Sequence, residues 1–287
     1  MSLPRRSFLA AAPALPLAAG ARAQTPRRLR FAVGPFQPTA GDTRRAYEPF
    51  FAHLARAAGR PCELTVTTDW AGITVALAND QADCAWMEPW GFVLAKDRVA
   101  AEAIAVVNYN ELPTYQAIIL ARPELAIAQF PHDARGMAIS FADAGSTSGW
   151  LIPHHWFRTQ GIDPRRYFRY RDGASHPANV TAVANGQVDL ATDFDRNLAA
   201  MIRAGRVRAD QVRIVWRSDP LPNDALAVRC DLEPVLKAAL RDAALAIDAT
   251  AAGQAMPANY TGRIAATPES YAMIEAAGRA LGRIGGG

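Results

Sequence analysis

Short apolar runs alternate with longer amphipathic runs along most of this chain, and this alternation limits the folds that it can adopt. Strands predicted at residues 28–33, 62–67 and 83–87 are separated by helices predicted at 44–58 and 69–79. A β-α-β-α-β order is typical of a mostly parallel sheet with helices on its faces. Ligands of such sheets bind beyond the carboxyl ends of the strands, so functional residues are expected there.

The same rhythm restarts near residue 136 and predicts a second α/β unit. Its predicted elements are strands at 136–141, 167–170, 188–192 and 212–216 and helices at 151–160, 177–185 and 194–204. The other predicted elements are strands at 104–107, 115–121 and 225–229 and helices within 231–249 and 268–283. Irregular joints near 122 and 220 predict two lobes, one over 27–121 and 222–287 and the other over 122–221. Two such crossovers form a hinge about which the lobes can close on a ligand in the cleft.

The first 23 residues have the organisation of a secretory signal peptide. Arg5 and Arg6 precede an apolar segment that ends in Ala21-Arg22-Ala23, and the arginine pair resembles a twin-arginine signal. Removal of this segment takes away three of the 31 basic residues and no acid, which leaves 28 basic against 27 acidic residues. A nearly neutral, exported, periplasmic protein is therefore expected, and nucleic acid is not an expected partner.

Cysteine and histidine spacing argues against a metal site. Cys62, Cys84 and Cys230 are far apart and form no C-x-x-C pair, so free thiols are expected, buried in the first two cases. His154 and His155 are adjacent and would diverge by about 100° on a helix. No metal and no cofactor is predicted.

The residues of most chemical interest form a small-residue turn between a predicted strand and a predicted helix. Ser146, Thr147 and Ser148 lie in the sequence DAGSTSGWLIP at 143–153. A helix that begins there directs unpaired backbone N–H groups and the positive end of its dipole at the preceding space. With the three hydroxyls, these groups can bind one tetrahedral oxyanion by dipoles alone. The alternative is an ordinary Ser/Thr helix cap.

Five motifs in order carry a family resemblance. They are DWAG at 69–72, AWMEPWGFVLA at 85–95, GSTSG at 145–149, Ser-His at 175–176 and Pro-Asn-Asp at 222–224. Over about residues 28–280 the chain resembles the phosphate/phosphite/phosphonate-binding proteins of ABC transporters. The resemblance implies an α/β, two-lobe periplasmic-binding-protein fold of type II-like form. It also implies a non-enzymatic, monomeric protein that captures a phosphonate and delivers it to a membrane permease.

The resemblance also assigns residues to the ligand. These are Ser146, Thr147, Ser148 and His176 for the phosphonate group, Trp70 and Tyr115 for an aromatic wall, and Asp195 and Asp224 for an ammonium group. Asp193 is the alternative to Asp195. Trp70 departs from the tyrosine usual in the family and offers a single N–H donor. Two acids in the cleft would repel inorganic phosphate and favour a cationic tail, so 2-aminoethylphosphonate is the predicted ligand.

Other interpretations of the same residues stay open. Asp224 is also explained as a turn residue, Asp195 as a helix cap, and Trp70 and Tyr115 as core aromatics. Phosphite, phosphate and alkylphosphonates are alternative ligands. A Ser/His hydrolase and a sensor input module are alternative functions, although Thr147 at the centre of a G-x-S-x-G frame is unusual for a nucleophile.

Overall fold

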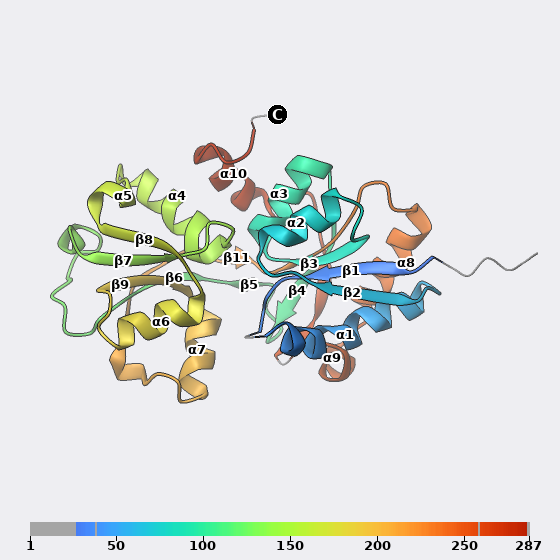
Figure 1. Ribbon diagram of the computed structural model, residues 1–287, viewed down its shortest axis with the longest axis horizontal. Helices are drawn as coiled ribbons and strands as arrows, with labels where there is room; N and C mark the ends of the chain where they lie inside the picture. Colours follow the sequence, from blue (N-terminus) through green and yellow to red (C-terminus); the bar gives the residue numbers. More distant parts are fainter. Residues whose placement is uncertain (1–26, 38, 258, 286–287) are drawn as a thin grey trace, which may run out of the picture.

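The structure, a computed structural model, describes residues 27–37, 39–257 and 259–285 and consists of two α/β lobes side by side (Figure 1). The predicted α/β fold with two lobes is confirmed. The predicted signal peptide at residues 1–23 lies outside the described residues. Within the described ranges, no helix combines the length and the apolar character needed to cross a bilayer.

The first lobe is built on a mixed sheet with the strand order β13-β4-β12-β3-β1-β2. Its strands are β1 (Leu29–Val33), β2 (Cys62–Val66), β3 (Cys84–Met87), β4 (Glu102–Tyr109), β12 (Ala225–Val228) and β13 (Tyr260–Ala265). The strands β1, β2 and β3 are parallel, as the β-α-β rhythm predicts, whereas β12 and β13 are antiparallel to their neighbours. The strand β13 was not predicted from the sequence.

Helices cover both faces of this sheet, and the apolar side chains of β1 and β3 are buried between them. The helices of the first lobe are α1 (Ala40–Ala57), α2 (Ala71–Ala78), α3 (Pro89–Val99), α8 (Pro234–Leu245), α9 (Ala249–Ala255) and α10 (Ala272–Ala280). Thr39 caps α1 by accepting a hydrogen bond from the N–H of Asp42. The three cysteines are free: Cys84 is buried, Cys62 is half-buried and Cys230 is exposed.

The second lobe has a smaller mixed sheet with the order β10-β6-β9-β7-β8. Its strands are β6 (Ala117–Ala121), β7 (Ala138–Ala142), β8 (Arg169–Ala174), β9 (Leu190–Phe194) and β10 (Arg213–Arg217). Its helices are α4 (Ile152–Thr159), α5 (Pro164–Tyr167), α6 (His176–Ala184) and α7 (Asp195–Arg203), with single turns at His132–Ala134, Thr147–Leu151 and Ala209–Gln211. The parallel strands β7 and β9 both end at the edge that faces the first lobe.

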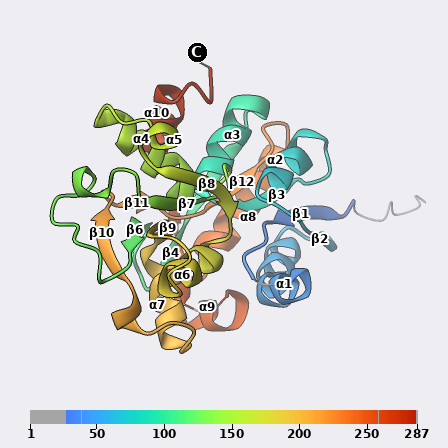
Figure 2. The same cartoon turned by 60° about the vertical axis from the view of Figure 1, so that its left-hand side comes forward.

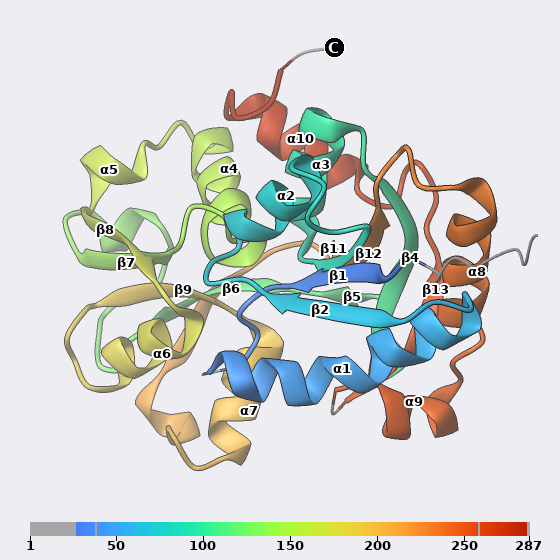
Figure 3. The same ribbon diagram turned by 45° about the vertical axis from the view of Figure 1, so that its right-hand side comes forward.

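Two antiparallel crossovers join the lobes. The strands β5 (Thr114–Tyr115) and β11 (Leu221–Pro222) pair with each other, with Leu221 opposite Tyr115. Figure 3 shows β5 and β6 following one another from one sheet towards the other. The predicted strand at 115–121 is thus divided at Gln116, and its second part belongs to the second sheet. The predicted boundary at residue 121 had placed that part in the first lobe.

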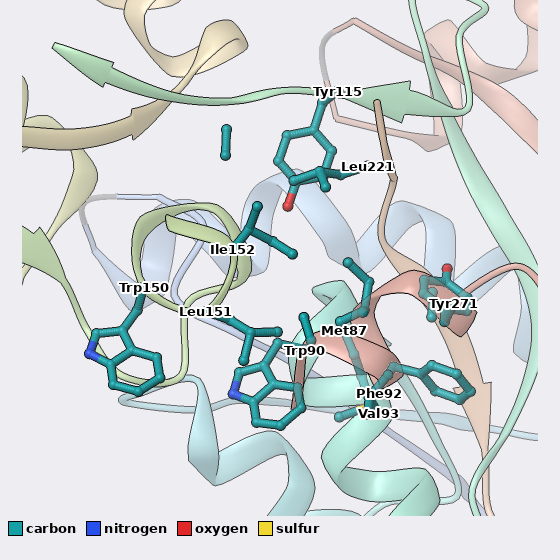
Figure 4. Close-up of a cluster of buried hydrophobic side chains, with 14 of the residues drawn as sticks. Met87, Trp90, Phe92, Val93, Tyr115, Trp150, Leu151, Ile152, Leu221 and Tyr271 are labelled. Atoms are coloured by element: carbon teal, nitrogen blue, oxygen red, sulfur yellow. The ribbon is translucent and has the colours of Figure 1, made fainter. Parts of the chain in front are cut away.

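One side of the interlobe contact is a dry, apolar core. The helix α10 contacts both α3 of the first lobe and α4 of the second (Figure 2). Trp90 at the start of α3 is 2% exposed and packs in one cluster with Leu151 and Ile152 of the second lobe (Figure 4). Gly278 of α10 is required there, because a Cβ atom would lie 2.5 Å from the Trp90 ring. Trp90 therefore lies beneath the predicted site as a packing residue.

Candidate functional site

The Ser146–Ser148 turn follows β7 and begins a helix, as predicted. Ser146 is the N-cap, and its Oγ accepts a hydrogen bond from the N–H of Gly149 at 3.1 Å. The first turn, Thr147–Leu151, is a π-turn that runs directly into α4. Thr192 of β9 fixes it from below by donating to the carbonyl of Gly149 at 2.6 Å. All three hydroxyl residues of the turn are at most 5% exposed, so the turn is a rigid, covered set of donors.

His176 lies beside this turn at the start of α6 and is oriented from behind by Asp193. Its Nδ1 is 3.1 Å from Oδ1 of Asp193, and its Nε2 is 3.0 Å from Oγ of Ser146. Asp193 is fully buried and also accepts from Nδ2 of Asn197. Burial raises the pKa of Asp193 above its usual value, although the hydrogen bond from His176 acts in the opposite direction. Asp193, the alternative to Asp195 for the ammonium group, is therefore a partner of His176 in this structure.

Gly149 is what allows His176 to approach the turn. A Cβ atom at Gly149 would lie 2.8 Å from Cε1 of His176 and 2.3 Å from Cβ of Ala142. Neither neighbour can retreat easily, because Ala142 is in a buried strand and His176 is held by Asp193. Only glycine fits at this position without moving the strand or the histidine.

Thr147 is occupied by a contact between the lobes. Its hydroxyl donates to the carboxyl group of Glu88 and accepts from the N–H of Trp90 at 2.8 Å. Glu88 is the N-cap of α3 and also accepts from the N–H groups of Trp90 and Gly91. Burial raises the pKa of Glu88 to about 8, and the hydrogen bond from Thr147 partly offsets this effect. The Glu88–Thr147 clasp was not predicted; the signal for it in the sequence was an acid directly before Pro89, at a helix start.

The two predicted aromatic residues both lie next to the turn. Tyr115 is 7% exposed on β5, and burial raises the pKa of its phenol while a hydrogen bond with Ser148 acts in the opposite direction. Figure 4 shows the phenol oxygen directed towards Ile152 at the start of α4. Trp70 is half-buried, and its Cβ is close to Gly145 at the other end of the turn. The structure thus brings Trp70, Tyr115 and the turn together.

Asp224 and Asp195, predicted for an ammonium group, have different surroundings. Asp224 is 5% exposed and accepts from Nε1 of Trp86 at 2.9 Å. Burial raises its pKa, whereas Arg196, Trp86 and Arg263 act to lower it. Asp195 is the first residue of α7, and its carboxylate accepts from the N–H of Arg196 at 2.8 Å. Within the described residues, no hydrogen bond joins Asp195 to Asp224 or to the turn.

Two arginines near Asp224, the half-buried Arg196 and the buried Arg263, were missed by sequence reasoning. The guanidinium carbon of Arg196 lies 4.4 Å from the ring centre of Tyr109 and 4.9 Å from that of Tyr115. The guanidinium carbon of Arg263 lies 3.7 Å from the ring centre of Phe50 and 4.5 Å from that of Trp86, and burial lowers its pKa to about 9. The sequence predicted that dipoles alone would bind the oxyanion. The turn fits this expectation, whereas the region around Asp224 contains the positively charged side chains of Arg196 and Arg263.

A cavity of about 430 Å³ opens beside this charged region. Rings from both lobes line it, namely Phe36, Tyr47 and Tyr260 from the first lobe and Phe194 from the second. Phe194 also packs edge-to-face against His176 at 4.8 Å and against Tyr115 at 5.9 Å. Phe194 therefore contacts the cavity on one side and His176 and Tyr115 on the other. Among the described residues, no group of three or more His, Cys, Asp or Glu is placed to hold a metal ion.

Comparison with known protein families gives a match over most of the chain. Residues 31–271 match the family described as "ABC transporter, phosphonate, periplasmic substrate-binding protein". The phosphate-import protein PhnD of Mycolicibacterium smegmatis is 26% identical over 204 residues, which are 67% of this chain and 64% of that protein. The phosphonates-binding periplasmic protein of Escherichia coli is 24% identical over 200 residues, 68% of this chain and 59% of that protein. The matched part thus spans less than two thirds of either relative.

Solved structures show the same fold. A binding-protein component of an ABC phosphonate transporter from Pseudomonas aeruginosa superposes with a TM-score of 0.76 at 24% identity, covering 88% of this chain and 85% of that one. PhnD1 from Prochlorococcus marinus, in complex with methylphosphonate, superposes with a TM-score of 0.77 at 17% identity, covering 89% and 98%.

Proposed function

This chain belongs to the phosphonate family of periplasmic substrate-binding proteins of ABC transporters, and on that premise we propose that it captures a phosphonate between its lobes and delivers it to a membrane permease. We further propose that it acts in the periplasm, as a monomer, after removal of residues 1–23. The family match covers residues 31–271, which include both lobes and both crossovers.

The observation that carries the proposal is the convergence of donors at the Ser146–Ser148 turn. Ser146 caps the first helical turn and its Oγ lies 3.0 Å from Nε2 of His176, so hydroxyl, backbone N–H and imidazole groups lie together at this turn. Tyr115 of the opposite lobe packs in one cluster with Leu151 and Ile152, next to Ser148. Dipolar donors arranged around a point suit the three oxygens of a phosphonate group. Thr147 serves the site differently, by fixing α3 to the turn through Glu88.

The same contacts suggest how the ligand is enclosed. Glu88 and Trp90 of the first lobe bind Thr147 of the second, and β5 and β11 form the hinge. A ligand that bonds to Ser148 and Tyr115 at once bonds to both lobes and favours the closed state by its differential affinity. The closed form is then the one that the permease recognises.

The tail of the ligand is a separate question. The two acids predict 2-aminoethylphosphonate, and this stays a prediction. Its ammonium group would have to displace or share the partners that Asp224 already has, which are the indole N–H of Trp86 and the charge of Arg196. An uncharged or anionic tail requires no such exchange.

Isothermal titration of the purified chain tests the proposal. We expect methylphosphonate to bind with a micromolar or lower Kd, and Ser148→Ala to weaken it at least ~tenfold, because one donor and the bridge to Tyr115 are lost. Thr159→Ala, an exposed hydroxyl near the end of α4, is the control and should bind like the wild type. The absence of binding to every phosphonate, phosphite and phosphate in the panel would refute the proposal.

The Ser146–His176–Asp193 chain has the distances of a hydrolytic triad, so an enzyme is the second function to test. Ser146 is also the helix cap, however, and its Oγ is held by the N–H of Gly149. We expect no turnover of phosphonate or carboxylic esters by the purified chain. Sustained hydrolysis that disappears in Ser146→Ala would identify a hydrolase.

A further inference from the structure

We propose that Arg196 is the specificity-determining residue at the tail end of the ligand site, and that it selects a phosphonate whose tail carries an anionic group, such as a carboxylate. This inference rests on the proposed function and specifies the ligand class. The positive charge at the tail end of the site would then belong to Arg196 of α7, and the ligand tail would carry the negative charge.

The position of Arg196 gives the first argument. Its guanidinium lies over Tyr109 and Tyr115, with Phe194 5.9 Å away, so aromatic rings surround it in the space between the lobes. Tyr115 is common to both ends of the site, because it packs in one cluster with Leu151 and Ile152 next to the turn while its ring meets Arg196. A ligand with its phosphonate at the turn and a short tail along Tyr115 therefore reaches Arg196.

The unmet hydrogen bonds of Arg196 give the second argument. Its Nε and Nη1 atoms are buried and have no hydrogen-bond partner in the described part of the chain. Buried guanidinium donors without an acceptor cost free energy that a ligand can recover. Each of these two nitrogens can form a fork with Nη2, side-on for Nε and end-on for Nη1, and either fork binds a carboxylate through two parallel hydrogen bonds. An ammonium group has no acceptor to offer them.

The charges around Asp224 give the third argument. Both Arg196 and Arg263 act on Asp224, and its Oδ2 accepts from the indole N–H of Trp86. Two guanidinium groups therefore stabilise the charged form of one carboxylate before any ligand binds. An additional cation would be repelled by both arginines, whereas an anion would balance the excess.

Titration of the purified chain with three probes tests this inference. The probes are phosphonoacetate, methylphosphonate and 2-aminoethylphosphonate, which share the phosphonate group and differ in tail charge. We expect wild-type protein to bind phosphonoacetate at least ~tenfold more tightly than 2-aminoethylphosphonate, with methylphosphonate between them. Equal affinities, or a preference for 2-aminoethylphosphonate, would overturn the inference.

The variant Arg196→Gln should remove this ranking. Phosphonoacetate should lose at least ~tenfold in affinity, methylphosphonate should change by less than about threefold, and 2-aminoethylphosphonate should bind more tightly than to the wild type. Arg203→Gln, exposed at the other end of the same helix, is the matched control and should leave the ranking unchanged. Arg196→Lys keeps the charge without the fork and should keep part of the preference, which provides a folded alternative if glutamine destabilises α7.

The outcomes distinguish failure of the role of Arg196 from failure of the proposed phosphonate-binding function. If no probe binds the wild type, the proposed function itself fails. If methylphosphonate binds but Arg196→Gln weakens all three probes by the same factor, phosphonate capture stands and Arg196 is not the selector of the tail.

Discussion

The turn at Ser146–Ser148 and the region around Asp224 face the same interlobe space but differ in how they present charge. The turn has hydroxyls, backbone N–H groups and a histidine held by a buried acid. The region around Asp224 has formal charges, with Arg196 and Arg263 sharing one carboxylate. The first suits any phosphorus oxyanion, since every such ligand has the same oxygens. The second discriminates among tails, because a full charge attracts or repels according to sign.

The turn and the region around Asp224 are also built from different parts of the fold. The turn is one continuous segment between β7 and α4, and apart from the contact of Thr147 with Glu88 and Trp90 its hydrogen bonds are to residues of its own lobe. Asp224 follows a crossover in the first lobe, whereas Arg196 belongs to α7 in the second. Lobe closure therefore changes the tail end more than it changes the turn.

Gly149→Ala gives the largest expected effect and acts on the turn alone. The added methyl group meets Ala142 at 2.3 Å and His176 at 2.8 Å, so β7 or the histidine must move. We expect the free energy of unfolding to fall by about 3 kcal/mol and binding of every phosphonate to become undetectable by titration. Gly41→Ala is the control, since an added methyl group at this exposed helical position makes only ordinary van der Waals contacts and should keep or slightly gain stability in thermal unfolding. A variant that still binds methylphosphonate normally would show that His176 is not needed near the turn.

Glu88 controls a pH effect on the clasp between the lobes. Its pKa is about 8 in the folded chain and near 4.5 when unfolded, so the folded state retains a proton that the unfolded state loses between these values. Stability from this group is full below about pH 4.5 and is lost as the pH rises through 8, with a limiting slope of ~1.4 kcal/mol per pH unit. Glu88→Gln should therefore reduce the decline between pH 5 and 7 by on the order of 2 kcal/mol in denaturant unfolding.

The matched control for that effect is Glu63→Gln on the exposed side of β2, which should leave the pH profile unchanged. Asp193 and Asp224 also have raised pKa values and contribute slopes of the same sign. Their contributions cancel in the difference between wild type and variant. An identical pH slope in wild type and Glu88→Gln would contradict a protonated Glu88 at neutral pH.

Asp193→Asn should weaken phosphonate binding by about tenfold, ~1.4 kcal/mol, for all tails alike. The carboxylate fixes the ring of His176 through Nδ1, and an amide does so less firmly. Titration with phosphonoacetate and methylphosphonate measures whether the loss is uniform. Asp210→Asn, with a largely exposed side chain, serves as the control. A loss confined to one tail would place Asp193 at the tail end, as its proximity to Asp195 in the sequence suggested.

The fold was largely predictable from the sequence because its signal is local. The apolar run at 83–87 forms a buried strand. The Ser/Thr turn at 146–148 begins a helix, and this signal is local because it does not depend on where the helix packs. The strand β13 was missed because Gly262 and Arg263 interrupt its apolar pattern. Arg263 is 6% exposed against Phe50 and Trp86, a place where a sequence pattern predicts an apolar residue.

Of the candidate site, the Ser146–Ser148 turn could be predicted from the sequence, but the surroundings of the ligand tail could not. The reason is again that only local signals can be read from a sequence. Ser146, Ser148 and His176 belong to motifs whose spacing defines them. Arg196 is an ordinary helical arginine in the sequence, and only folding places it over Tyr109 and Tyr115. Asp224 is recognisable as an acid after a proline turn, but its partners are distant in sequence, so its availability to a ligand cannot be read from the motif.

Asp224→Asn gives the smallest expected effect and distinguishes the two descriptions of the tail end. Asparagine keeps an acceptor for the indole of Trp86 while removing the charge shared by the arginines. If Arg196 receives the tail, affinity for 2-aminoethylphosphonate changes by about threefold or less, ~0.65 kcal/mol, and phosphonoacetate binds slightly more tightly. If the ammonium instead sits on Asp224, the same substitution weakens 2-aminoethylphosphonate by ~tenfold or more and leaves methylphosphonate unchanged. Titration of both ligands against wild type and variant thus decides whether the carboxylate serves the ligand or the arginines.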